Sequence, residues 1–204
     1  VAEESTGFNI DLNQEFVLTS GATLDINLLL FTTRVDNPLR LVDAGNKQLA
    51  YRQPDDFLET QGAELGVVWR WNDFKYFFGY THADVKEYTE TRVRMAPLMP
   101  KDRVNNVFVY EREDDFRIGL EAYYYGTQGL TDGSMARDFW IFGLMMEKRI
   151  DDDFSVFLNF ENFSDTRQTR FGSIFTGSRL NPVFADIFAP LDGSVVNGGL
   201  KIRL

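Results

Sequence analysis

The sequence contains no cysteine and a single histidine, His82. Without cysteine there is no disulfide framework and no thiolate metal site, and one histidine cannot build a histidine-rich metal centre. An excess of cations is also lacking, because 21 Lys and Arg face 31 Asp and Glu, for a formal net charge of −10. A nucleic-acid surface needs clustered cations to hold phosphates, so nucleic acid is excluded as a partner.

Long apolar runs are absent as well. The longest one, WIFGLMM at 140–146, is far shorter than the roughly 18 residues that a membrane-spanning helix needs. A helical membrane protein is therefore excluded, whereas a membrane β-barrel is not. The first residues, VAEESTGF, lack the cationic and apolar regions of a secretion signal. An exported protein would carry that signal further upstream.

Apolar and aromatic residues are abundant, and they alternate with polar ones. The composition is 44% hydrophobic and 15% aromatic, which is too apolar for a disordered chain. Near the start, Phe8, Ile10 and Leu12 alternate with Asn9 and Asp11, and this period of two predicts a strand. The same pattern recurs and predicts roughly nine strands. Many of them span about 11 to 15 residues, against about 5 to 6 for an ordinary strand.

The predicted connections are of two kinds that follow each other in strict succession. Tight turns are expected at 19–22, 72–73, 114–115 and 151–153, and long loops near 43–47, 89–100, 128–137 and 164–192. Short turns on one rim and long loops on the other are typical of an outer-membrane barrel, whose apolar face meets lipid. Aromatic residues near strand ends would then form interface girdles: Trp69, Trp71, Tyr110, Phe116, Phe139 and Trp140.

Two other architectures are compatible with the alternation. A soluble or secreted β-sandwich would use the aromatics as its core and bind a carbohydrate or a protein partner through its long loops. An independent small barrel could act as a passive pore or an adhesin. Strand length and the asymmetry of the connections favour a membrane barrel. An odd strand count near nine favours a portion of a larger one, because single-chain bacterial barrels have even numbers of strands.

The segment NFENFSDTRQ at 159–168 resembles the penultimate-strand landmark of TonB-dependent outer-membrane receptors. The tail is similar to that family too, with APLDG at 189–193 before a final alternating GGLKIRL. Other segments that resemble the family are INLLLFTTRVDNPL, TQGAELGVVWRW, FFGYTHADVKEY and EAYYYGTQGLTDG. The terminal Leu204 departs from the Phe or Trp with which many outer-membrane proteins end.

This resemblance implies an all-β fold, an antiparallel transmembrane β-barrel of 22 strands occluded by an N-terminal plug. Residues 1–204 would supply about nine C-terminal strands, while the plug and the energy-coupling segment lie upstream in that family. The implied function is import of a scarce nutrient across the outer membrane without enzymatic activity or cofactor. The implied partners are the lipid bilayer, the TonB complex through the missing N-terminal part, a surface lipoprotein, and a small-molecule or glycan ligand. The sequence leaves a siderophore, cobalamin and a glycan open as substrates.

Eight residues are the candidates for site and landmark roles. His82, Tyr123 and Tyr125 come near the loop ends of their strands and are expected to line a ligand vestibule, with strand-end packing as the alternative for each. A structural role at the loop that enters the last strand is expected for the landmark residues Glu161, Asn162, Asp165, Pro190 and Gly193.

The acidic clusters carry no prediction of chemistry. The run Asp151–Asp153 lacks the glycine and the following glutamate of a calcium loop, so a solvated turn is the better interpretation. Neighbouring carboxylates at 55–56 and 114–115 would point to opposite faces of a strand and could not share a substrate. No G-x-S-x-G motif occurs, and a catalytic triad has only one histidine to draw on. No catalytic residue and no metal site are therefore predicted.

Overall fold

The computed structural model describes residues 2–18, 21–45 and 48–203, and the alternating segments of the sequence form one large antiparallel sheet within them. The elements in chain order are β1 Glu4–Val17, β2 Thr23–Asp36, β3 Arg40–Gly45, β4 Gln48–Arg52, β5 Phe57–Trp71, β6 Phe74–Tyr88, β7 Val93–Met95, β8 Asp102–Arg112, β9 Phe116–Tyr125, β10 Gln128–Gly129, β11 Met135–Ala136, β12 Phe139–Arg149, β13 Phe154–Glu161, the short 3-10 helix η2 Gln168–Arg170, β14 Phe175–Ser178, β15 Asn181–Phe184 and β16 Val195–Ile202.

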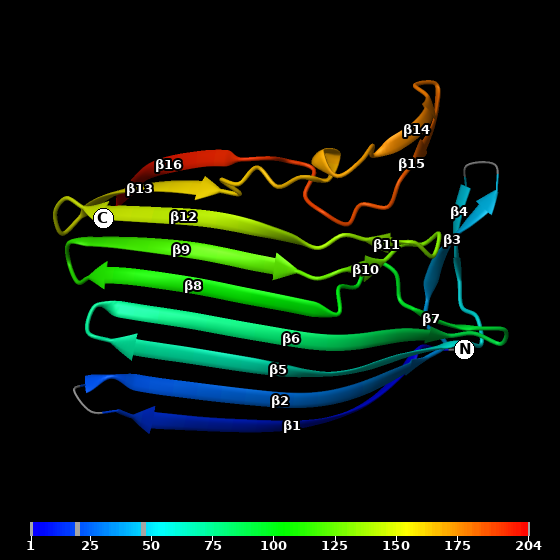
Figure 1. Ribbon diagram of the computed structural model, residues 1–204, viewed down its shortest axis with the longest axis horizontal. Coiled ribbons are helices and arrows are strands. Elements are labelled where there is room, and N and C mark those ends of the chain that lie inside the picture. Colours follow the sequence, from blue (N-terminus) through cyan, green and yellow to red (C-terminus); the bar gives the residue numbers. More distant parts are fainter. Residues whose placement is uncertain (1, 19–20, 46–47, 204) are drawn as a thin grey trace.

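The large sheet has the strand order β1-β2-β5-β6-β8-β9-β12-β13-β16, and β7 adds a short pairing to β6. Each long strand lies beside the next long strand of the sequence, as in a meander (Figure 1). The prediction of roughly nine long strands is confirmed. The three remaining pairs, β3-β4, β10-β11 and β14-β15, are two-stranded hairpins inside the long loops, and the sequence pattern did not predict them.

Tight turns and long loops lie at opposite ends of the sheet, as expected (Figure 1). The tight turns use residues that tolerate a left-handed backbone, with φ of 50° at Asn72 and 60° at Asp114. The predicted turn at 19–22 and loop at 43–47 each include positions outside the described residues, 19–20 and 46–47, and Leu204 is also outside them. We call the two ends of the sheet the turn end and the loop end.

The sheet is a single curved layer with very little core. Within the described part of the chain, the buried hydrophobic residues are Ala22, Ala96, Ala136, Phe139 and Ala189. No second large sheet packs against the first among these residues, so the β-sandwich alternative is wrong. Across the same residues, no helix is both long enough and apolar enough to cross a membrane.

Aromatic rings form two bands on the apolar face of the sheet. At the turn end, successive rings of Trp69, Trp71, Phe74, Tyr110 and Phe116 contact one another across four strands, with centroid distances between 4.8 and 6.3 Å. At the loop end, a second series of contacts joins the rings of Tyr124, Trp140, Phe142 and Phe163. On β9 the two bands begin at Phe116 and Tyr124, a separation that suits the about 9 to 11 residues of a tilted membrane-crossing strand.

Phe139 is the one expected girdle residue that does not lie in these bands. It pairs with Tyr125, whereas the girdle residue Trp140 pairs with Tyr124. Because successive side chains of a strand point to opposite faces, Phe139 is on the polar face, where the long loop covers it and leaves 7% of it exposed. The expectation failed because a strand-end aromatic does not by itself reveal which face of the sheet it occupies.

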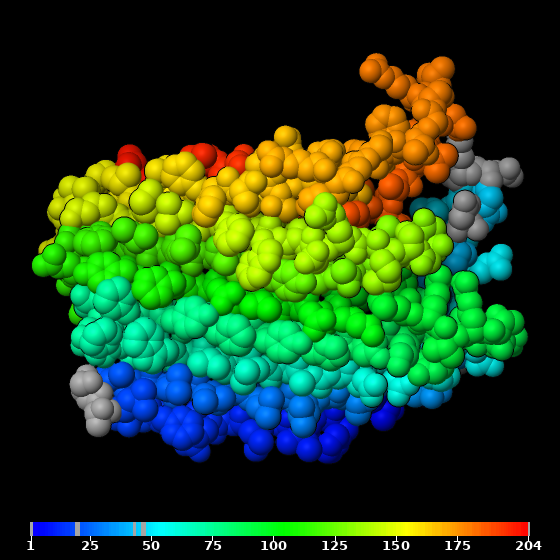
Figure 2. Space-filling model, viewed as in Figure 1, coloured from blue at the N-terminus to red at the C-terminus, as the bar shows by residue number. Residues whose placement is uncertain are grey.

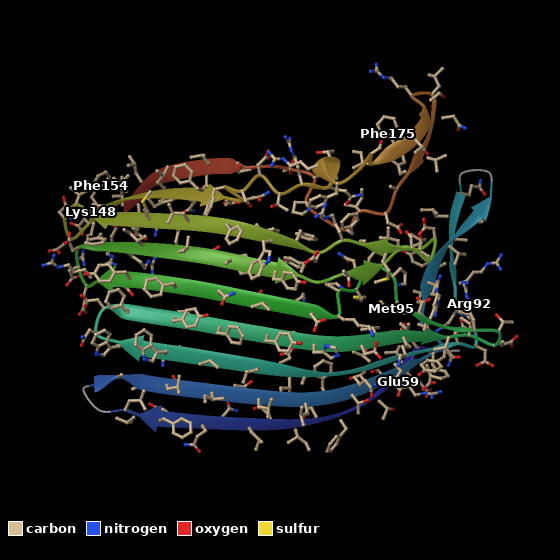
Figure 3. All side chains as sticks on the ribbon, in the orientation of Figure 1. Glu59, Arg92, Met95, Lys148, Phe154 and Phe175 are labelled. Carbon is tan, nitrogen blue, oxygen red and sulfur yellow. The ribbon has the colours of Figure 1, made fainter. Side chains whose placement is uncertain are left out.

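The chain has a dense body and one hairpin that projects from it. In the space-filling view the long strands form a continuous slab, and β14-β15 projects beyond it at the loop end (Figure 2). The side-chain view places Lys148 and Phe154 at the turn end, and Glu59, Arg92 and Met95 toward the loop end (Figure 3).

Candidate functional site

Ion pairs and hydrogen bonds cover the polar face of the sheet near the turn end. Glu147 has three partners. Its carboxylate accepts hydrogen bonds from Lys201 Nζ at 2.7 Å, Arg117 at 3.2 Å and Ser155 Oγ at 2.9 Å. Lys75 and Glu111 form another pair, with Nζ and Oε2 2.7 Å apart. These pairs connect neighbouring strands, and the Lys201–Glu147 pair reaches across β13 from β16 to β12, on a surface that would be the wall of a water-filled lumen.

A hollow of about 690 Å³ lies on this polar face between the Glu147 network and the long loop after β13. Its wall combines strand residues and loop residues, and five of the sequence candidates are among them: Tyr123, Glu161, Asn162, Pro190 and Gly193. The structure therefore brings one vestibule candidate together with four of the landmark residues. Further charged groups of the wall are Arg117, Glu121, Glu147, Asp192 and Lys201.

The vestibule candidate Tyr125 lies at the edge of this wall, next to Phe139. Their rings stack with centroids 5.0 Å apart and an angle of 15° between planes. The stack continues through Phe171 to Phe188 of the long loop, at centroid distances of 6.3 and 6.2 Å. Arg137 places its guanidinium 4.8 Å from the centre of the Phe171 ring. We call the four rings of Tyr125, Phe139, Phe171 and Phe188 the aromatic shelf.

A cationic side chain lies beside the aromatic shelf. Arg103 pairs with Tyr125 across β8 and β9, so both side chains are on the polar face. Arg103 is exposed, and it forms no ion pair with any residue in the described parts of the chain. The shelf thus presents flat rings and the charged groups of Arg103 and Arg137 at the loop end of the polar face.

Two buried glutamines hold the long loop over the shelf. Gln168 is 3% exposed, donates a hydrogen bond to the Asp186 carbonyl at 2.6 Å and accepts one from the Phe188 N–H at 2.8 Å. Gln128, also 3% exposed, donates to the Phe188 carbonyl at 3.1 Å. Buried polar groups of this kind are costly to leave unpaired, so these bonds fix the loop backbone around Phe188.

Asn162 organises the backbone where the chain leaves β13. Its Nδ2 donates to the Thr166 carbonyl at 2.7 Å, and its Oδ1 accepts from the Thr166 N–H at 2.9 Å. Its backbone has φ of 48°, a left-handed conformation that asparagine tolerates better than most residues. The Ser194 hydroxyl also donates to the Asn162 carbonyl at 2.8 Å, which links this turn to the approach to β16.

Asp165 and Gly193 lie against each other across the same junction. The Asp165 carboxylate pairs with Arg167 at 3.3 Å and with Arg170. A side-chain carbon added at Gly193 would collide with the Asp165 carboxylate, so this close approach needs a glycine. Pro190 takes part through its carbonyl, which accepts a hydrogen bond from the Gln168 N–H at 2.8 Å. Glu161 accepts a hydrogen bond from the Asn197 amide at 2.6 Å.

His82 is separate from the two tyrosines. It pairs with Ala63 on one side and with Asp102 on the other, which places it on the apolar face of the sheet. Its Nδ1 lies 2.8 Å from Asp102 Oδ1, and the Tyr80 hydroxyl donates to the same carboxylate at 2.6 Å. The structure therefore does not bring His82 to the shelf, and a role for any of the three candidates in ligand binding stays a prediction.

Sequence reasoning missed most of the shelf and both buried glutamines. Phe171 and Phe188 lie in irregular chain, and Gln128 and Gln168 lie in the very short elements β10 and η2, where no periodicity reveals burial. Arg103 could have been found from the sequence, because it lies in an alternating strand and the alternation places it on the polar face. The acidic turn at 151–153 contacts a cation, because Arg149 donates to Asp152 Oδ1 at 3.0 Å. No group of three or more His, Asp or Glu that could hold a metal occurs in the described segments.

A family model of the TonB dependent receptor-like β-barrel matches residues 2–163. The chain belongs to this family. It is thus part of an outer-membrane receptor β-barrel. The match ends at Phe163, so half of the 159–168 landmark and the last strand lie beyond it. No curated protein matches the sequence.

Solved structures of receptors extend the likeness to nearly the whole chain. The ferric-catecholate import receptor Fiu from E. coli K12 matches 97% of the chain at 16% identity, with a TM-score of 0.62. The pyoverdine receptor FpvA from Pseudomonas aeruginosa PAO1 matches 99% at 16% identity and a TM-score of 0.66, and the copper transporter OprC matches 97% at 14% identity and 0.68. The chain covers 27%, 30% and 31% of those three chains, so it spans less than a third of their length.

Proposed function

We propose that this chain is the C-terminal part of the barrel of a TonB-coupled receptor that imports a ferric siderophore of the catecholate class. In this proposal residues 1–204 form one stretch of barrel, a plug occupies the lumen beside the polar face, and an N-terminal part engages the TonB complex. The observation that carries the choice of substrate is the aromatic shelf with Arg103 and Arg137 beside it.

The chemistry of the shelf suits an anionic aromatic chelate. A ferric tris-catecholate complex has flat rings and a net negative charge. Tyr125 and Phe171, which are both half-buried, offer flat apolar surface, the Tyr125 hydroxyl offers a polar tip, and the two guanidiniums offer charge-assisted donors. Tyr123 lies on the same face as Tyr125, two residues further from the loop end. It would contact a ligand that moves along the polar face toward the hollow of about 690 Å³. Cobalamin and glycans have less need of paired cations.

The long loop has a supporting role in this proposal. The bonds of Gln128, Asn162 and Gln168 hold Phe171 and Phe188 over the strand residues, which pre-organises the shelf and lowers the entropic cost of binding. The landmark residues then act through the structure of the loop, and four of them also line the hollow of about 690 Å³. A surface lipoprotein would find an apolar contact on β14-β15, where Leu180 is 94% exposed and Phe184 72%.

The test is ligand binding by the protein extracted from outer membranes in a mild detergent. Quenching of intrinsic fluorescence would be titrated with a ferric tris-catecholate, and cobalamin, copper(II) and an oligosaccharide would be added as competitors. Tyr125→Ala is expected to weaken binding about tenfold, since stacking and cation contacts contribute on the order of 1 to 2 kcal/mol. The matched control is Tyr124→Ala, the next residue along β9, which points to the lipid-facing side.

Two results would contradict the proposal. Equal effects of the Tyr125 and Tyr124 substitutions would remove the shelf from the binding site. Displacement of the catecholate by cobalamin or an oligosaccharide at equal concentration would place the substrate in another class. Loss of uptake in iron-starved cells that carry Arg103→Gln, with normal amounts of protein in the outer membrane, would support a role of the cation in transport.

A further inference from the structure

Three of the five methionines of the chain lie around Gly129 at the loop end. Met135 is the cross-strand partner of Gly129 in the hairpin β10-β11. Met95, the last residue of β7, places its Sδ 3.6 Å from the position that a side-chain carbon at Gly129 would occupy. Leu98 donates its N–H to the Gly129 carbonyl at 2.8 Å, and Met99 follows it directly. We call Met95, Met99 and Met135 the methionine cluster.

Met95 and Met135 share one side of the β10-β11 hairpin. Residues directly opposite each other in an antiparallel pair point their side chains to the same face, with Cβ atoms about 4.5 to 5.5 Å apart. The Met135 side chain therefore projects to the side on which a Gly129 side chain would stand, and the Met95 sulfur already lies there. Because methionine has three rotatable bonds, the Met135 sulfur can approach the Met95 sulfur across this glycine.

The backbone that carries Met95 and Met99 is held by its own hydrogen bonds. Ala96 is 5% exposed and donates its N–H to the Val85 carbonyl at 2.9 Å. Leu98 has a left-handed backbone with φ of 61°. This conformation is uncommon for leucine, and strained positions of this kind gather at ligand-binding regions. The bond of the Leu98 N–H to β10 holds the following Met99 beside the hairpin.

Packing alone does not account for methionine at these positions. A methionine usually fills an irregular gap in a core. In this cluster Met99 is 49% exposed and Met135 is 55% exposed, so both thioethers are open to solvent. The two remaining methionines, Met145 and Met146, are half-buried within β12. The cluster is thus an exposed group of sulfur atoms on a fixed backbone.

The methionine cluster lies on the outer side of the barrel wall, beyond the hydrocarbon layer. Met95, labelled in Figure 3, pairs with Lys86, which occupies the same face of β6 as His82. Lys86 is the thirteenth residue of β6, whereas a tilted strand crosses the hydrocarbon layer in about 9 to 11 residues. On the hairpin, Gln128 faces the long loop, so the next position and its partner Met135 face away from it. The cluster is therefore separate from the aromatic shelf.

Thioether sulfur selects soft metal ions. Mg²⁺ and Ca²⁺ take oxygen ligands, whereas Cu(I) takes thiolate and thioether ligands. Cysteine, histidine and carboxylate ligands must be deprotonated before they bind a metal. A thioether has no proton to lose, so a site built from methionine alone keeps its affinity as the pH falls.

We propose that Met95, Met99 and Met135 bind one Cu(I) ion through their three sulfur atoms at the external surface of the barrel. The inference rests on the methionine cluster and does not depend on which substrate the lumen carries. It is tested with a metal ion and not with a siderophore, so failure of either proposal leaves the other in place.

Metal binding by the whole receptor, extracted from outer membranes in a mild detergent, tests the proposal. Cu(I), kept reduced by ascorbate, would be titrated in competition with bicinchoninate, and Ag(I) would serve as a probe that needs no reductant. Met95→Leu with Met135→Leu is expected to weaken binding at least about tenfold, because two ligands are lost while the apolar volume is kept. Met145→Leu with Met146→Leu removes the same number of methionines from β12 and is the matched control.

Oxidation of the parent protein examines each methionine separately. Dilute hydrogen peroxide transfers one oxygen atom to a thioether and leaves a sulfoxide and water. The peroxide reacts with the sulfur lone pair that a bound metal ion occupies. Ag(I) should therefore slow the oxidation of the methionine cluster severalfold and leave the rates of Met145 and Met146 unchanged, as peptide mass spectrometry would measure.

Three outcomes would overturn the inference. The first is equal Cu(I) affinity of the two double variants, and the second is Ag(I) protection that is absent or spread evenly over all five methionines. The third is a Cu(I) affinity that falls steeply between about pH 7.5 and pH 5, which would assign the metal to histidine or carboxylate ligands. Heat-dependent gel migration of each variant would confirm that its barrel is folded.

Discussion

Replacement of Asn162 provides a quantitative test of how the long loop is joined to the sheet. Asn162→Ala removes the 2.7 Å bond to the Thr166 carbonyl and the 2.9 Å bond from the Thr166 N–H. Each is worth about 1 kcal/mol, and the left-handed backbone at φ 48° costs alanine about 1 kcal/mol more. The free energy of unfolding should therefore fall by about 3 kcal/mol. Asn162 is only 8% exposed, so water cannot easily replace the lost hydrogen bonds.

Two further variants separate these contributions. Asn162→Gly loses the side-chain bonds and tolerates the left-handed backbone, so we expect a loss of about 2 kcal/mol. Asn72 has a similar φ of 50° in a tight turn, and Asn72→Ala should cost about 1 kcal/mol, the backbone part alone.

The assay is the free energy of unfolding in detergent micelles, measured by urea titration of tryptophan fluorescence. Limited proteolysis between residues 164 and 192 would be followed in parallel, since the loop should be cut faster when its anchor is lost. If Asn162→Ala costs no more than Asn72→Ala, the side-chain bonds carry no stability and the reasoning is refuted.

Three further predictions concern other parts of the chain. Gln168→Ala should speed proteolytic cleavage near residue 186 at least severalfold while leaving the unfolding transition of the sheet in place, which mass spectrometry of the fragments would show. Leu120→Arg, on the lipid-facing side, should destabilise the barrel by about 2 to 4 kcal/mol in lipid, whereas the lumen-facing Asn105→Arg should be tolerated. Ser134 holds the pKa of Asp132 below its usual range, so this carboxylate stabilises its loop above the ordinary carboxyl pKa and loses that effect as the pH falls through the lowered value. Cleavage by pepsin across that range should rise more in the parent than in Asp132→Asn.

The long strands and the two rims could be predicted from the sequence because both depend on local patterns. Alternation at Phe8, Ile10 and Leu12 fixes which side chains share a face, and the short turn at Asn72 fixes the register of β5 on β6. Tyr110 and Trp140, expected in the girdles as strand-end aromatics, do lie in the aromatic bands of the apolar face. Strand count then followed from the succession of turns and loops.

The loop structure and the site could not be predicted in the same way. The bonds of Gln168 reach residues 18 to 21 positions away in irregular chain, and no periodic pattern links them. Phe139 was assigned to a girdle because it is a strand-end aromatic, although its register places it on the lumen wall. His82 shows the same limit, since its position late in a strand says nothing of which face it occupies until the register with Asp102 is known.

The most direct test of the central claim, that the apolar face of this sheet meets lipid and the polar face lines a lumen, uses the absence of cysteine. Single cysteines at Ile26, Asn27 and Leu28 can be labelled without background, and their side chains alternate between the two faces. In reconstituted bilayers, a fluorophore at Ile26 or Leu28 should be quenched by doxyl-labelled lipids, and one at Asn27 by iodide in water. Equal access of iodide to all three positions, or lipid quenching at Asn27 alone, would contradict the account.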